Sequence, residues 1–268
     1  MAYLQRLLVS CLALGLPLVS ALAFPGAVGF GSIATGGTTP FVVTSLADSG
    51  TGTFRDAVSV SGRNITFAVS GYIVLESPVS LSSDITINGQ TAPSPGIAVM
   101  GREVSASSKT NIIIRNFRMR QGNLDTDTGK SAFNIGDFDQ FADTGGFFSH
   151  DIINNYFIAG PSTTSAGDDY FQMNANQEVF ASGNFLDSNK DGVLNGAAAN
   201  TVGSALVLSA PWNSGSTALA TLTAAQAFTS VVASAGASPR DQVDAFVVAT
   251  VQSLGTSGAI ITNQVQPF

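Results

Sequence analysis

The chain has 268 residues, of which 44% are hydrophobic and only 11% are charged. Its 11 basic and 18 acidic residues give a formal net charge of −7. This balance argues against nucleic acid as a partner, because proteins that bind nucleic acid present basic surfaces. The only cysteine is Cys11, so no disulfide can form within the chain. Stability must therefore come from buried apolar groups and backbone hydrogen bonds.

Residues 1–23 have the pattern of a secretory signal peptide. Arg6 supplies the positive charge, an apolar run follows, and Ala21-Leu22-Ala23 is an A-x-A cleavage site, with cleavage after Ala21 as an alternative. A membrane helix is the competing interpretation, but the run is short and Pro17 interrupts it. The sequence predicts a secreted, extracellular protein with no membrane partner, in which residues 24–268 form a single domain.

From residue 41 to residue 185 the sequence is a series of short strands. Each run is rich in β-branched or aromatic residues and is bounded by turn residues, mainly Asn and Gly. The runs are Phe41–Thr44, Asn64–Val69, Tyr72–Leu75, Asp84–Asn88, Gly96–Met100, Asn111–Arg120, Asp151–Phe157 and Glu178–Asn184.

The spacing of these runs predicts an all-β protein built as a parallel β-helix. The starts at Ile65, Ile85, Ile112, Ile152 and Val179 are 20, 27, 40 and 27 residues apart. About 20 to 30 residues suit one coil of a solenoid, and the longest spacing suits a coil with an insertion or a seam. A β-sandwich is the alternative, but its strands recur more often and are joined by hairpins. Several runs here end in Asn, as expected where side-chain amides stack at coil corners.

The segment from Asp187 to Asn195 has the order D-x-N-x-D-G-x-x-N of a calcium-binding loop. The predicted metal ligands are the polar side chains at alternate positions: Asp187, Asn189, Asp191 and Asn195. Position twelve of such a loop carries a bidentate carboxylate, but this chain has Ala198 there. The sequence predicts either a weak structural calcium site or a turn rich in Asp and Asn.

A first helix is predicted over Thr223–Ala235, within a helical segment at about 220–255. Thr223 and Gln226 form a capping box at its start, and Gly236 follows its end as a C-terminal glycine.

A second helix is predicted over Pro239–Leu254. Ser238 is the expected N-cap, and Val243, Val247 and Val251 form the expected buried stripe. Both helices are expected to pack beside the β-helix and to close its exposed end.

Several segments carry a distinctive order of glycines and charged residues: Phe24–Gly31 with Ala34–Gly37, Thr44–Val58, Ile87–Pro93, Ile112–Gly122, Asp151–Pro161 and Ala235–Ala245. In this order they resemble segments of secreted fungal pectate lyases, over residues 24–130 and 145–254. The resemblance implies a right-handed parallel β-helix with two C-terminal α-helices packed alongside.

The resemblance also implies a function. The protein would be a polysaccharide lyase that cleaves plant cell-wall uronan (pectate) by calcium-assisted β-elimination. Calcium held by acidic side chains would neutralise the substrate carboxylates, and an arginine would remove the proton α to them. The implied partner is an acidic plant cell-wall polysaccharide, and we expect a monomer.

Two features depart from the family pattern. Ser131 stands where the resemblance places the first metal aspartate, and no arginine occurs between Arg120 and Arg240. The resemblance therefore implies that central coils are missing, which a solenoid tolerates because each coil contacts mainly its neighbours. No residue is assigned as catalytic. The alternative function is a catalytically inactive, truncated β-helix protein that binds polysaccharide, for which no eliminase activity is expected.

Arg118 and Arg120 are the predicted substrate-binding residues. They are two positions apart on one strand, so they face the same side. The alternative is that they brace neighbouring coils through hydrogen bonds to the backbone. A second candidate calcium site is an acidic cluster, although such clusters are more typical of solvated loops: Asp125, Asp127, Asp137, Asp139 and Asp143. His150 is expected to be structural, and Asn64 begins the only N-glycosylation sequon.

Overall fold

The computed structural model describes residues 22–120, 133–134, 148–165, 167, 173–212 and 220–259. Residues 1–21 of the predicted signal peptide (1–23) and the five aspartates between 125 and 143 lie outside these residues. No helix in the described ranges is long and apolar enough to cross a membrane.

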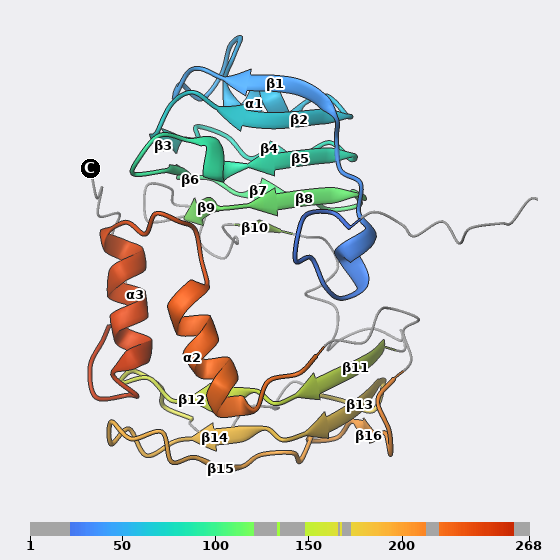
Figure 1. The fold of residues 1–268 in the computed structure, drawn as a ribbon, viewed down its shortest axis with the longest axis vertical. Coiled ribbons are helices and arrows are strands. Elements are labelled where there is room, and N and C mark those ends of the chain that lie inside the picture. The colour runs from blue at the N-terminus through green and yellow to red at the C-terminus, as the bar shows by residue number, and fades with distance from the viewer. Residues whose placement is uncertain are drawn as a thin grey trace, which may run out of the picture.

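The first half of the chain forms a stack of parallel coils with three faces (Figure 1). One sheet contains β1 (Thr39–Val43), β2 (Arg63–Phe67), β5 (Ile85–Asn88) and β8 (Ile112–Arg115). The second contains β3 (Gly71–Val74), β6 (Ile97–Met100) and β9 (Phe117–Arg120), and the third contains β4 (Val79–Ser80), β7 (Val104–Ser105) and β10 (Phe133–Asn134). All of these strands pair in parallel. The predicted parallel β-helix is confirmed, and Ile85 lies opposite Ile112 as the spacing predicts.

The core of this stack lies between its three sheets. Sixteen described residues form one buried cluster, because alternate side chains of each strand point inward. Its largest fully buried members are Phe54, Ile65, Ile73, Leu75, Leu81, Ile85, Ile87 and Ile97. Burying each such side chain stabilises the fold by about 1.5–3 kcal/mol relative to leaving it exposed, so within the described residues this stack carries most of the hydrophobic stabilisation.

A second stack follows from residue 148. One sheet contains β11 (Phe148–Ile153), β13 (Gln177–Ser182) and β16 (Leu206–Val207), and the other contains β12 (Tyr156–Ile158), β14 (Phe185–Asp187) and β15 (Ala197–Ala198). The pairing is parallel except between β14 and β15. Only Val179 and Val202 form its buried cluster among the described residues. Within the described ranges no strand of this stack pairs with the first stack.

The corners between successive strands use residues that tolerate a positive φ. Asn116 and Asn154 follow β8 and β11 with φ of 50° and 57°, and Gly183 follows β13 with φ of 68°. The predicted stacking of side-chain amides is confirmed, because Asn88 Nδ2 donates to Asn64 Oδ1 at 2.6 Å. Asn184 stacks in the same way in the second stack, where Asn155 Nδ2 donates to its Oδ1 at 3.1 Å.

Three α-helices and two short 3-10 helices complete the described structure. Helix α1 (Phe54–Val58) packs against β1 and β2, and the 3-10 helices are η1 (Phe30–Ile33) and η2 (Gly89–Thr91). Helices α2 (Ala224–Ser234) and α3 (Gln242–Gln252) lie alongside the two stacks (Figure 1). The predicted capping box of Thr223 and Gln226 is present at α2.

Two expectations for α3 are wrong. Its N-cap is Asp241 rather than Ser238. The Asp241 carboxylate accepts from the Asp244 amide, and the Asp244 carboxylate accepts from the Asp241 amide, which is a capping box. The valine stripe is not buried: Val247 is 48% and Val251 40% exposed. No residue of α3 is fully buried, so packing of this helix depends on its polar N-terminus.

Candidate functional site

Strand β9 presents Arg118 and Arg120 toward the start of α3. Arg118 Nε lies 2.7 Å from Asp244 Oδ2 and 3.4 Å from Asp241 Oδ2. Arg120 Nη1 lies 2.8 Å from Asp241 Oδ2, and its Nη2 lies 2.7 Å from Asp244 Oδ1. Both arginines reach the same two carboxylates because residues two apart on a strand such as β9 point to the same side. Two guanidinium groups and two carboxylates thus form one four-membered ion-pair cluster.

Neutral groups complete this cluster. Arg118 also donates to the carbonyl oxygens of Pro95 and Pro239. Arg120 donates to the hydroxyl of Tyr72 on β3, and this hydroxyl donates to Asp241 at 3.3 Å. Each charged group therefore has several partners, as buried charges require.

Two members of the cluster are buried, so their charges must be balanced within the cluster. Arg118 is 5% and Asp241 6% exposed. Burial alone would raise the pKa of Asp241, but the Asp244 amide and the guanidinium groups of Arg120 and Arg118 outweigh it and lower this pKa. The cluster is neutral when all four side chains are charged, and it joins α3 to the last described coil of the first stack.

The prediction that Arg118 and Arg120 bind substrate stays a prediction. Both guanidinium groups are engaged by carboxylates, and the predicted bracing role describes their contacts more closely, although Asp side chains rather than backbone are the main acceptors. Asp244 and Tyr72 were not predicted from the sequence as members of this cluster. The signal for Asp244 was available, because Asp241-x-x-Asp244 before an apolar run has the spacing of a capping box.

Arg240 does not contact Asp241 or Asp244 through a described ion pair; it binds the C-terminal end of α2. Its Nη2 donates to the carbonyl oxygens of Val232 at 2.7 Å and Ala235 at 3.2 Å. A cation at these carbonyls satisfies the C-terminal end of the helix and interacts favourably with its dipole.

The structure brings the four predicted calcium ligands together between β14 and β15. Asn189 Nδ2 donates to Asp191 Oδ2 at 3.0 Å and to Asn195 Oδ1 at 2.9 Å, and the Asn195 amide donates to Asp187 Oδ2 at 3.4 Å. The hydrogen bonds from Asn195, Val193 and Asn189 lower the pKa of Asp191.

The calcium site implied for catalysis in the family has no counterpart in the described part of the chain. There, no three or more His, Cys, Asp or Glu side chains gather as a metal site would require. The aspartates at 125, 127, 137, 139 and 143 are not among these residues. His150 lies on β11, and burial lowers its pKa.

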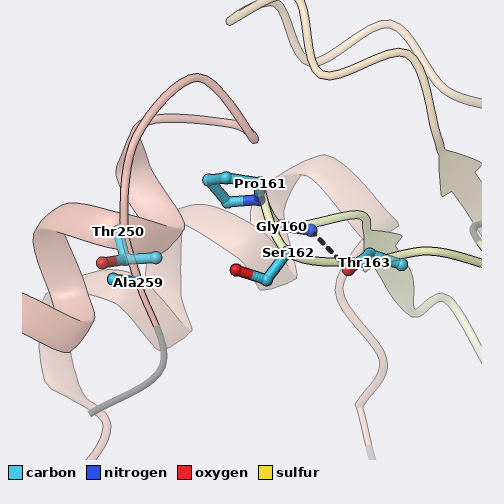
Figure 2. Close-up of a pocket in the computed structure, with 6 residues that line it drawn as sticks. All are labelled: Gly160, Pro161, Ser162, Thr163, Thr250 and Ala259. Atoms are coloured by element: carbon cyan, nitrogen blue, oxygen red, sulfur yellow. Dashed lines mark hydrogen bonds between the residues drawn. The ribbon is translucent and has the colours of Figure 1, made fainter.

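A cavity of about 260 Å³ lies between the loop after β12 and α3, and Figure 2 shows the residues that line it. Its lining comprises Gly160, Pro161, Ser162, Thr163, Thr250 and Ala259. Thr163 Oγ1 accepts from the Gly160 amide at 3.0 Å, and Thr250 Oγ1 donates to the Phe246 carbonyl oxygen at 3.0 Å. The lining contains no ionisable side chain, so it offers no acid or base for catalysis.

Comparison with known proteins identifies the family. The chain is 31% identical to a probable pectate lyase C of Neosartorya fischeri, in a match that covers 96% of this chain and 83% of the relative. A probable pectate lyase C of Aspergillus fumigatus is 31% identical, over 97% of this chain and 84% of the relative. The chain belongs to the pectate lyase family. A third pectate lyase relative, from Emericella nidulans, is 29% identical over 91% of this chain and 79% of its own length. No family model matches the sequence.

The pectate lyase relatives are longer within the matched region. The match to the Neosartorya fischeri protein runs over 353 positions, whereas this whole chain has 268 residues. At least 85 positions of the alignment, which is 353 less 268, therefore have no counterpart in this chain. At about 20 to 30 residues a coil, this corresponds to several coils of a solenoid. That the missing coils are central stays a prediction.

Proposed function

We propose that this protein acts on pectate, the acidic uronan of plant cell walls, as an extracellular polysaccharide lyase. The observation that carries the proposal is the 31% identity to a probable pectate lyase over 96% of the chain. The parallel β-helix supports it, because this architecture presents long sheet faces along which an extended polymer can lie.

The proposed reaction is calcium-assisted β-elimination. A base removes the proton α to the uronate carboxylate, the bond to the leaving sugar oxygen breaks, and a double bond forms in the ring. Calcium bound at the substrate would lower the cost of the negative charge that develops. The described residues do not fit a catalytic calcium site, so no step is assigned to a metal ligand of this chain.

A second candidate function is binding of the polysaccharide without cleavage. The specific observation in its favour concerns the arginine that would act as the base: no arginine lies between Arg120 and Arg240. Arg118 and Arg120 are engaged by Asp241 and Asp244, and Arg240 by the end of α2. These contacts would have to break before any of the three guanidinium groups could reach a substrate.

The test measures cleavage and binding on the same preparation. The purified protein is incubated with polygalacturonate and calcium at alkaline pH, and the ultraviolet absorbance of the unsaturated product is followed. Affinity electrophoresis through gels that contain polygalacturonate measures binding. Product that requires calcium supports the lyase, and retardation without product supports the second candidate. Neither product nor retardation would overturn both.

A further inference from the structure

A cavity of about 270 Å³ lies between α2 and α3, which contact each other side by side (Figure 1). Six of its lining residues are valines: Val231, Val232, Val243, Val247, Val248 and Val251. Val231 is 58%, Val247 48% and Val251 40% exposed, so folding leaves this apolar wall open. Apolar surface that a folded protein leaves uncovered is typical of a ligand-binding groove or an interface.

The charged residues of the cavity lie toward one end of α3. Arg240 precedes this helix and Asp244 lies in its first turn, whereas Val247, Val248 and Val251 follow along it. Since a helix rises about 1.5 Å per residue, the stretch from Asp244 to Val251 spans about 10 Å. The cavity therefore has a polar end and an apolar arm, which is the form that an amphipathic ligand would fill.

Arg240 brings an unbalanced positive charge to the polar end. Its Nη2 donates to the carbonyl oxygens of Val232 and Ala235. Among the described residues, its Nε and Nη1 make no hydrogen bond and its guanidinium group makes no ion pair. Arg120 and Asp244 also line the cavity, but they pair with each other. One positive charge is left over, and it complements a single negative charge on a ligand.

We propose that this cavity binds a small amphipathic carboxylate, whose head group lies at Arg240 and whose apolar tail lies along the valines of α2 and α3. A carboxylate accepts charge-assisted hydrogen bonds from guanidinium donors, and the tail is stabilised by leaving water. The volume is near the lower end of ligand pockets, about 300 Å³, so the ligand is small. A sugar is a poor fit, because the valine side chains offer no hydrogen-bond partner for its hydroxyl groups. The proposal is therefore independent of the proposed action on pectate.

The first measurement is isothermal titration calorimetry of the full chain with decanoate, at concentrations at which decanoate is monomeric. Decanoate should bind about tenfold or more tightly than decanol, which has the same number of carbons and no charge, because hydrogen bonds to charged groups are the stronger ones. Octanoate should bind about tenfold more weakly than decanoate, since two fewer methylene groups leave water. Absence of decanoate binding, or equal affinities for decanoate and decanol, would overturn the proposal.

Substitutions of Arg240 test the head group. Arg240→Gln should remove the preference for decanoate over decanol, and unchanged decanol binding would show that the variant is folded. Arg240→Lys keeps the charge and should keep most of the preference. Lys109→Gln removes an exposed positive charge outside the cavity and should keep all of it. A preference for decanoate that survives in Arg240→Gln would contradict the assignment of the head group. If Arg240→Gln does not fold, Arg240→Lys and the comparison of ligands on the parent protein still decide the proposal.

A substitution in the apolar wall tests the tail. Val247→Asp should weaken binding of decanoate and decanol by about tenfold or more, because it places a carboxylate against the tail. Val60 is also 48% exposed and lies outside the lining, so Val60→Asp should leave both affinities unchanged. Sedimentation velocity tests the other occupant, a second copy of the chain. A dimer that Val247→Asp dissociates and that excludes decanoate would overturn the proposal in favour of an interface between copies. None of these measurements depends on lyase activity.

Discussion

Replacing Arg118 with methionine should test whether the ion-pair cluster holds α3 on the first stack. The methionine keeps an apolar stem of similar reach but removes the charge and the donors. The variant leaves Asp241 and Asp244 with Arg120 as their only described cationic partner, and Arg120 has a side chain that is 21% exposed. Removing one partner of a buried ion pair costs about 3–5 kcal/mol, because the remaining charge is uncompensated.

The expected loss is at this level because Arg118 is nearly inaccessible. Its side chain is 4% exposed, and it contacts both carboxylates and two carbonyl oxygens. Arg120 is more exposed, and Arg120→Met should cost about 1.5–3 kcal/mol, as for hydrogen bonds to charged groups. The order of the two variants is therefore part of the prediction.

Urea unfolding followed by circular dichroism measures these losses. For a chain of this size, the Arg118→Met loss should lower the melting temperature by about 10 °C. Lys109→Met removes one exposed positive charge and should change stability by less than about 0.5 kcal/mol. Adding Asp244→Leu to Arg118→Met should recover part of the loss, since it removes an uncompensated carboxylate. A loss below about 1 kcal/mol in Arg118→Met would refute the reasoning.

Three more predictions concern acid, a corner glycine and glycosylation. Because the pKa of Asp241 is lowered in the folded protein, its contribution is present above a pH of about 4 and is lost as the pH falls through the folded-state pKa; Asp241→Asn should flatten this acid limb of stability against pH. Gly183→Ala should cost about 1–3 kcal/mol in urea unfolding, because φ is 68° and a Cβ would lie 2.0 Å from Asn154 Oδ1. Gly62→Ala has a positive φ but open space, so it should cost less, and equal losses would contradict the steric part of this argument. Asn64 should stay unmodified, because it lies in β2 between two strands with its Oδ1 bonded to Asn88; a fall in intact mass on enzymatic deglycosylation would show the opposite.

The strands could be predicted because their signal is local. Ile85 and Ile112 pair at the predicted spacing, and the Asn155–Asn184 amide stack follows from asparagines that recur at coil corners. The third sheet was missed because its strands, such as β4 and β7, have only two residues each. A pair of residues shows no periodicity, so only the stacking of complete coils reveals them.

The candidate site was less predictable because its partners are distant in sequence. Arg118 and Asp244 are 126 residues apart, and no local pattern links a strand to a helix across that distance. By contrast, the loop from Asp187 to Asn195 could be found from sequence, since its four polar residues occur within nine positions in the order of a calcium motif. The burial of Asp187 could not be predicted in this way, because it depends on the strands around it.

The valines of α3 show where local pattern stops being informative. Val243, Val247 and Val251 have the spacing of a buried stripe, and the helix forms where that spacing predicts it. Whether the stripe is covered depends on how many coils lie beside the helix, and at least 85 of the 353 positions matched to a pectate lyase relative have no counterpart in this chain. Because each coil of a solenoid contacts mainly its neighbours, coils can be lost while the sequence of a flanking helix still suits the longer stack. The buried ion pairs at the α3 N-terminus then have to hold a helix that its apolar face does not.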